Sequence, residues 1–478
     1  MNKVLKNILI AALVTGGISS CNKYLDVKPE TSVLQDDAYQ SETGFMQHLN
    51  GVYLALSAQD MYGGAMTMQI PDLLAQRYFQ SASPTHYSYY EIATFDYTNT
   101  VVKPVFAAYW ASLYKQIANV NTILDHIDGQ KNVFTHHNYE MIKGEALALR
   151  AFLHFDALRM FGPVYKSSDS TRNAIPYYSR WTQVPQPFLP ANQVIDSLLR
   201  DVQQASALLS QDPVILNGPN GDPTYPYAAA RNLRFNYYAV KALEARIHLY
   251  RGNKANAFAA AQTVIAAQPG KFPFTATNDG AIKADPSLLG DCLFMAQNTK
   301  LVNSYNTWFA YTLQDADLLA PRADMLNSIY ADASDVRIRS AIWNLPPDGS
   351  RTIKCFLKYA PLSQQKPNTM VPLFRASECY LIAAESAPDA TSGLGYLNTL
   401  RVARNIAALP ANAMLNDEIR KEYMREFYGE GQLFYYYKRT FATSIPNAAT
   451  TSSSGKVTMS ATQYVVPIPD QELTVHHP

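Results

Sequence analysis

Acidic side chains in two loop-like stretches are the first candidates for catalysis. Glu91 and Asp96 lie in the stretch 60–102, and Asp315 and Asp317 lie in the stretch 269–370. Glycoside hydrolysis needs two carboxylates that face a sugar across roughly 5–9.5 Å. Acidic residues in loops are usually solvated surface groups, so we expect no catalytic pair. A hydrolase on this chain stays an alternative, to be tested by turnover of a glycan.

Metal and phosphate chemistry have weaker candidates. His136, His137 and Glu140 lie close together, but adjacent histidines point in different directions, and no third ligand follows at zinc-type spacing. Gly63-Gly64 lacks the strand–glycine–helix context of a phosphate loop. The sequence has no Gly-x-Ser-x-Gly elbow. We therefore predict no metal site, no cofactor and no enzymatic activity.

Aromatic side chains concentrate in the same two stretches, which we call the first (60–102) and second (269–370) aromatic stretches. Sugar rings have apolar C–H faces that stack on tyrosine and tryptophan, while their hydroxyls bond to polar side chains. The alternative for each ring is plain packing beneath a loop. The candidate ligand-binding residues are Tyr87, Tyr89, Tyr90, Tyr97, Asn99, Asn303, Tyr305, Asn306, Trp308 and Tyr311.

A long helix over 139–162 is the element around which the chain is organised. Apolar residues follow the 3.6-residue period on two faces, and a helix apolar on most sides is buried. Gly162-Pro163 ends it. Its charges need partners if buried, and Asp156 and Arg159 can pair at i,i+3.

Further helices follow from the same period. Small residues in 235–267, with a turn at Gly252-Asn253, are typical of a tetratricopeptide-type helical pair, although no strict 34-residue period runs through the chain. Two prolines indicate an extended tail over 464–472. The predicted fold is mostly α, a helical-repeat superhelix with a loop-rich face, and the remaining predicted helices cover 42–59, 105–127, 193–209, 371–384, 395–406 and 416–439.

The N-terminus resembles a lipoprotein leader. Lys3 and Lys6 precede a short apolar run, and the segment 18–21 looks like a bacterial lipobox ending at Cys21, the predicted lipidation site. We predict a signal peptide over 1–20, a lipidated tether over 21–31 and a single domain over 32–478. Within that domain, helical pairs cover about 104–163, 193–268 and 371–440, with loop-rich inserts at 60–102 and 269–370.

The net charge and the cysteine content limit the classes of function that the chain can have. The chain has 478 residues, with 40 Lys+Arg against 39 Asp+Glu and a net charge of +1. This balance argues against binding nucleic acid or an anionic membrane surface. Cys292, Cys355 and Cys379 have no metal-type spacing, and we expect buried free thiols.

Eight segments in order carry a family resemblance: 21–29, 110–121, 144–163, 242–252, 375–385, 397–404, 425–439 and 467–472, which together span essentially the whole chain. With these segments the chain resembles the SusD/RagB family of outer-membrane lipoproteins. It departs from the family pattern at Tyr435-Tyr436-Tyr437-Lys438, which replaces the acidic, leucine-containing run more usual before Arg439.

This resemblance implies one mostly helical domain with four tetratricopeptide-like pairs and a loop-rich ligand face. It also implies a non-catalytic lid on a SusC-type TonB-dependent transporter, which receives oligosaccharides or, in the RagB branch, peptides. The protein would be anchored by lipid to the outer membrane and face the cell exterior. A pure protein-interaction scaffold without a small ligand is a further alternative.

Overall fold

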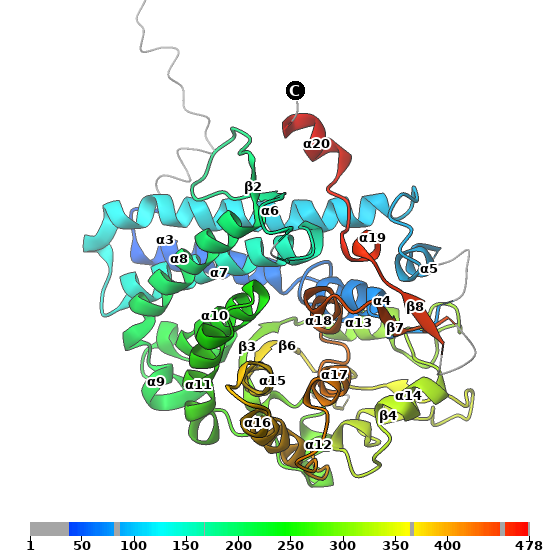
Figure 1. Cartoon of the computed structure of the whole chain (residues 1–478). Helices are drawn as coiled ribbons and strands as arrows, with labels where there is room; N and C mark the ends of the chain where they lie inside the picture. The colour runs from blue at the N-terminus through cyan, green and yellow to red at the C-terminus, as the bar shows by residue number, and fades with distance from the viewer. Residues whose placement is uncertain (1–37, 81–86, 167, 364–367, 450–454, 477–478) are drawn as a thin grey trace, which may run out of the picture.

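Helix α7 (Asn138–Phe161) lies in the interior of the protein (Figure 1). The structure is a computed structural model, which describes residues 38–80, 87–166, 168–363, 368–449 and 455–476. Only Glu140 and Lys143 of this helix are not buried. It packs between α6 (Lys103–Ile127) and α8 (Ala191–Leu208). The predicted buried helix is therefore confirmed.

The buried charges of α7 are all paired. Arg159 bonds to Asp156, as the i,i+3 spacing predicts. Arg150 binds Asp201 of α8 at 2.6 Å, and Glu145 binds Arg231 at 2.7 Å. Because a buried charge without a partner is costly, these pairs fix how neighbouring segments sit on α7.

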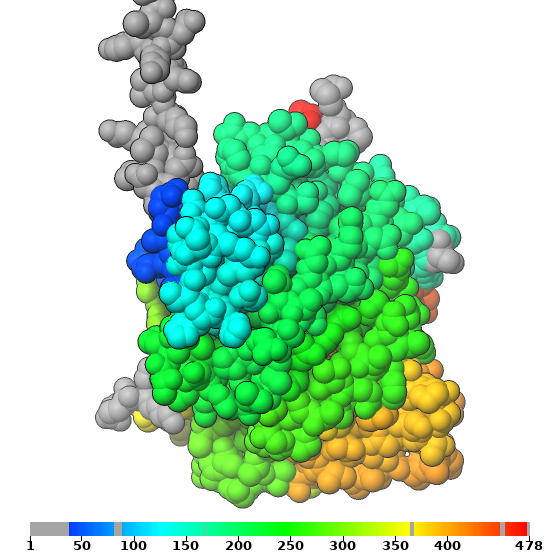
Figure 2. Space-filling model, turned by 90° about the vertical axis from the view of Figure 1, so that its left-hand side faces the viewer, coloured from blue at the N-terminus to red at the C-terminus, as the bar shows by residue number. Residues whose placement is uncertain are grey.

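Helices then stack in sequence against one another. Helix α8 contacts α10 (Tyr237–Arg251), which pairs with α11 (Lys254–Lys271); α11 contacts α15 (Ala376–Ser386), which contacts α16 (Ala390–Ala403) and α17 (Leu415–Glu426). Figure 2 shows this stack as a continuous surface, with α8 to α11 in green above α16 in orange. The mostly helical, repeat-like fold is confirmed.

The remaining helices are short or lie at the ends of the stack. Helix α3 packs on α6, and α18 follows α17. Their bounds are α3 Glu42–Leu56, α4 Ile70–Leu74, α5 Tyr87–Ala93, α9 Val214–Asn217, α12 Asp279–Ala284, α13 Leu301–Trp308, α14 Ala323–Ile329, α18 Leu433–Thr440, α19 Ala461–Tyr464 and α20 Asp470–His476.

The strands of the described residues form four antiparallel pairs. They are β1 (Asn173–Pro176) with β2 (Phe188–Pro190), β3 (Cys292–Gln297) with β6 (Met370–Arg375), β4 (Trp343–Asn344) with β5 (Cys355–Phe356), and β7 (Ser444–Pro446) with β8 (Lys456–Thr458). The prediction of a helix over 371–384 is wrong at its start, because 370–375 pair with the distant β3 and α15 begins only at Ala376.

Two other expectations need correction. The first aromatic stretch is not wholly irregular: it holds a π-helix (Ala65–Gln69), α4 and α5. The tail is extended only over 465–469, since α19 precedes that segment and α20 follows it. The predicted signal peptide, tether and Cys21 lie outside the described residues.

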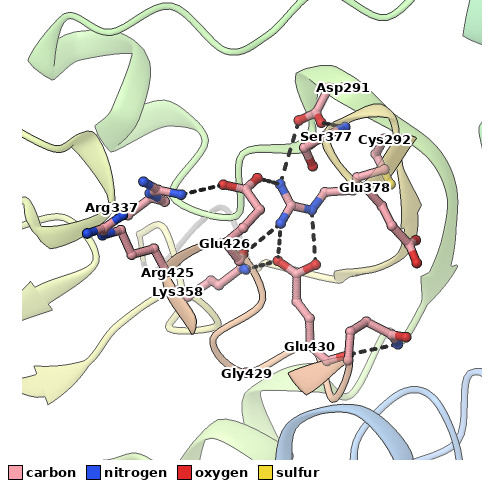
Figure 3. A network of polar contacts seen from close by, with 12 residues as sticks. Asp291, Cys292, Arg337, Lys358, Ser377, Glu378, Arg425, Glu426, Gly429 and Glu430 are labelled. Atoms are coloured by element: carbon pink, nitrogen blue, oxygen red, sulfur yellow. Dashed lines mark hydrogen bonds and ion pairs between the residues drawn. The ribbon is translucent and has the colours of Figure 1, made fainter. Parts of the chain in front are cut away.

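A buried charge network joins the ends of β6, α16 and α17 (Figure 3). Arg375 binds Glu430 at 2.9 Å, and Arg404 binds Glu426 at 2.6 Å. Burial alone would raise the pKa of Glu426, but the guanidinium groups of Arg404, Arg375 and Arg337 hold it well below its ordinary value. Glu426 and Glu430 are both bonded to arginine or lysine side chains, so the network holds elements together rather than acting on a substrate.

Cys292, Cys355 and Cys379 are buried free thiols, as predicted. Within the described part of the chain, every helix is either too short or too polar to serve as a membrane span.

Candidate functional site

A pocket of about 220 Å³ opens between the α4–α5 region and the β7–β8 hairpin. Residues around α5 form one wall, and residues 447–449 of the hairpin form the other. In Figure 1 these elements lie together at one end of the molecule, beside α14. The lining is mixed: the rings of Tyr90 and Phe95 are half-buried, and the amide side chains of Gln76, Gln80 and Asn447 lie among them.

The backbone at this pocket is strained. Gln76 has φ +59° and Phe95 has φ +62°, in the left-handed region that residues other than glycine seldom adopt. Gln76 is held there by its own side chain, whose Nε2 donates to the Ala93 carbonyl at 2.6 Å and whose Oε1 accepts from the Ala448 amide at 3.2 Å. One amide thus fixes both walls, and strain of this kind gathers at ligand sites.

Gln80 lines the pocket and has one buried polar atom without a hydrogen-bond partner among the described residues. Its side chain is only 4% exposed, and its Nε2 donates to the Phe79 carbonyl at 2.7 Å. Its Oε1 has no hydrogen-bond partner among the described residues. A buried acceptor without a partner costs about 1–3 kcal/mol.

The ten predicted ligand-binding residues fall into several environments. Tyr90 alone among them lines this pocket. Tyr89, Tyr97, Tyr305 and Trp308 are buried, Asn99 and Tyr311 are half-buried, Asn303 and Asn306 are exposed, and the side chain of Tyr87 lies outside the described residues.

The structure does bring the two aromatic stretches together. Trp308 Nε1 donates to Tyr89 Oη at 3.1 Å, and the Phe79 amide donates to the Ala320 carbonyl at 2.9 Å. Tyr97 donates to the Gln463 carbonyl at 2.6 Å. Burial raises the pKa of Tyr305 to about 12. Tyr89, Tyr305 and Trp308 are thus packed groups, and Tyr97 lines a different pocket, between the start of α6 and residues 466–471.

Two of the four acidic candidates, Asp96 and Asp315, bond to neighbouring side chains, and a third, Glu91, is buried. Glu91 is buried at 7% exposure. Asp96 accepts from Thr98 at 2.9 Å and from Asn99, and these bonds lower its pKa. Asp315 pairs with Arg351. No group of three or more His, Cys, Asp or Glu side chains among the described residues could hold a metal ion.

Sequence reasoning missed Gln76, Gln80 and Asn447. Glutamine and asparagine carry no periodic signal, and the hairpin wall lies more than 350 positions from the other wall, as the 372-residue separation of Gln76 and Ala448 shows. The only local hint was the density of rings in the first aromatic stretch, which contains Phe79, Tyr90 and Phe95.

Comparison with family models gives two matches. Residues 23–233 match the SusD-like family described as "Starch-binding associating with outer membrane". Residues 339–477 match the SusD family, also called SusD/RagB. A SusD-like protein of Formosa agariphila is 24% identical over 289 residues, which cover 58% of this chain and 48% of that protein. The match thus spans about half the length of that relative.

Solved structures share the fold. A SusD superfamily protein of Bacteroides thetaiotaomicron has a TM-score of 0.69 at 20% identity, covering 91% of this chain and 98% of its own. A SusD-like carbohydrate binding protein of Bacteroides vulgatus has a TM-score of 0.71 at 18% identity, with 91% and 96% covered. A surface glycan-binding protein of Bacteroides fluxus has 0.67 at 17%, with 91% and 97% covered.

Proposed function

Because this chain belongs to the SusD/RagB family, we propose that it is a surface lipoprotein that captures oligosaccharides and passes them, chemically unchanged, to a SusC-type TonB-dependent outer-membrane transporter. The family is one of carbohydrate-binding proteins associated with the outer membrane. In this proposal Cys21 carries the lipid that holds the protein on the outer face of the membrane, with residues 32–478 as one binding domain.

The mixed lining of the pocket, with two half-buried rings beside amide side chains, is the observation that carries the proposal. A sugar unit offers apolar C–H faces for Tyr90 and Phe95 and hydroxyls for polar side chains of the lining, such as the half-buried Asn447. Among the described residues that line the pocket there is no carboxylate, imidazole or thiol. This lining supports capture rather than hydrolysis, which needs a pair of carboxylates.

Calorimetry of the purified chain lacking residues 1–21 against glycan and peptide panels tests this function. We expect saturable binding of one glycan class, weakened about tenfold or more (~1.4 kcal/mol) by Tyr90→Ala. The control is Tyr311→Ala, which removes a half-buried tyrosine that does not line the pocket.

Three results count against the proposal. Equal affinity of Tyr90→Ala and the unmodified chain would take the site away from this pocket. Binding of peptides alone would favour the RagB-like alternative, a peptide-binding lid on an oligopeptide transporter. Release of shorter sugars from a bound glycan would show catalysis.

A further inference from the structure

A second pocket, of about 200 Å³, lies on the outer side of α6. It is lined by Trp110 and Tyr114 of α6, by the segment 178–182, and by Glu472 of α20. We call residues 177–182, which follow β1, the strap. None of these residues lines the pocket at the β7–β8 hairpin. In Figure 1, β2 and α20 rise above α6, whereas α5, β7 and β8 lie at one end of it.

The strap has no regular secondary structure between its ends, yet side chains of α6 and α7 hold its backbone. Asn121 donates to two of its carbonyls, and Arg150, itself paired with Asp201, donates to a third. The bonds are Tyr178 N to His154 Nε2 at 3.1 Å, Asn121 to the Tyr178 carbonyl at 2.9 Å, Asn121 to the Arg180 carbonyl at 3.2 Å, Arg150 to the Ser179 carbonyl at 2.6 Å, and Trp181 N to Asp125 at 2.9 Å.

This scaffold keeps a tryptophan in solvent. The side chain of Trp181 is 50% exposed although its backbone is fixed. Beneath it, the rings of Trp110 and Tyr114 lie 4.5 Å apart between centroids, and Tyr114 meets Tyr178 edge-on at 5.8 Å. Because the backbone of Trp181 is fixed, a flat ligand can stack on its exposed ring without a rearrangement of the loop.

The rim of the pocket is polar and balanced in charge. Arg180 and Thr182 lie on the strap side, and Glu472 lies on the α20 side. A guanidinium and a carboxylate can each bond two neighbouring hydroxyls, as donor and as acceptor respectively. The combined charge of the pair is zero, which disfavours an anionic or cationic ligand.

We propose that this pocket is a second binding site, which takes a single neutral sugar unit of an oligosaccharide, with one face on Trp181 and its hydroxyls on Arg180, Thr182 and Glu472. A volume of about 200 Å³ suits one ring rather than a long chain. The inference goes beyond the proposed function, because it places a second contact for a glycan on a different part of the surface.

The four tryptophans of the chain allow a site-resolved test. The chain lacking residues 1–21 is labelled with 5-fluorotryptophan, and each ¹⁹F signal is assigned by a Trp→Phe variant. Maltoheptaose, cello-, xylo- and manno-oligosaccharides are then titrated in turn. We expect at least one of them to shift the Trp181 and Trp110 signals in a saturable way while the signal of the buried Trp343 stays unchanged.

Variants separate the two sites. Trp181→Ala should weaken the sugar-binding step, whose affinity is read from the Trp110 signal, at least tenfold. Val184→Ala should leave this affinity unchanged, because Val184 is a 66% exposed residue of the β1–β2 connection that does not line the pocket. Tyr90→Ala should also leave that step unchanged, so failure of the first site and failure of the second are distinguishable. The absence of a saturable shift at Trp181 and Trp110 for every sugar, or an equal effect of Trp181→Ala and Val184→Ala, would overturn the second site. Loss of a copurifying protein on Trp181→Ala, with no sugar-dependent shift, would overturn it in favour of a protein contact.

Discussion

Glu426 should be among the residues on which the folded state depends most. It lies at the end of α17 with a side chain that has no measurable exposure, and it accepts from Arg337 at 2.7 Å and from Arg404 at 2.6 Å, as well as from Arg375. We consider the change Glu426→Gln, which keeps the shape of the side chain and removes its charge.

The expected loss of stability depends on which carboxylate partners each arginine keeps in the variant. Arg375 keeps Glu430, and Arg337 keeps Asp335. Arg404 keeps only Asp291, at 3.3 Å, and its Nη1 already has no partner among the described residues. Breaking a buried pair costs about 3–5 kcal/mol, because the remaining charge stays buried. We expect about 4 kcal/mol, a large part of the roughly 5–15 kcal/mol that stabilises a typical domain.

Urea unfolding followed by circular dichroism measures this loss, with the midpoint and the slope both compared with the unmodified chain. The matched control is Glu418→Gln on the same helix, whose partner Lys421 has a side chain 49% exposed. We expect that control to lose no more than about 0.5 kcal/mol. A Glu426→Gln chain that unfolds at the same urea concentration as the control would refute the view that this network holds the helical stack together.

Burial lowers the pKa of His154 to about 3, so its neutral ring contributes stability that is fully present above pH 6.5 and is lost as the pH falls towards 3. Between about pH 6.5 and 5, the free energy of unfolding should therefore fall by about 1 kcal/mol per pH unit more than in His154→Gln, and parallel pH profiles would contradict this. Burial raises the pKa of Asp72 to about 7, so its effect on the pH dependence of stability is opposite to that of His154. Stability present below about pH 4 is lost as the pH rises through 7, and Asp72→Asn should remove that loss in the same urea series. Gly252→Ala should lower the free energy of unfolding by about 1 kcal/mol, because Gly252 ends α10 at φ +86°. The control Gly129→Ala, also in open space but without a positive φ, should melt nearly as the unmodified chain does. Equal melting temperatures for the two variants would count against backbone strain at Gly252.

The helical scaffold was predictable from local pattern. The apolar period of α7 and the small residues of the α10–α11 pair set their burial and crossing, because both depend on residues three or four positions apart. The helix boundaries were less predictable where a distant partner intervened, as β6 shows by pairing with β3. A strand of six residues with a proline has no local signal that separates it from the start of a helix.

For the candidate site, the sequence predicted the aromatic region but not the individual residues that line the pocket. Aromatic density indicated the region around Tyr90, but it could not show which rings would pack inward, and Tyr89 and Trp308 became a buried contact. Gln76 bonds to both walls of the pocket, and the hairpin wall comes from the other end of the chain. Contacts of this range arise from the packed fold, which a local pattern does not encode.

The way in which the strap is held has a consequence for how its specificity can change. All five bonds that fix it join a main-chain carbonyl or amide group of the strap to a side chain of α6 or α7. The strap's own side chains contribute nothing to these five bonds. Arg180 and Trp181 can therefore be exchanged for other residues while the loop keeps its path, whereas Thr182 Oγ1 accepts from the Val184 amide at 3.0 Å and helps to hold the chain. At the proposed second site, a change of sugar preference thus needs only surface substitutions at these two positions and no remodelling of the helices below.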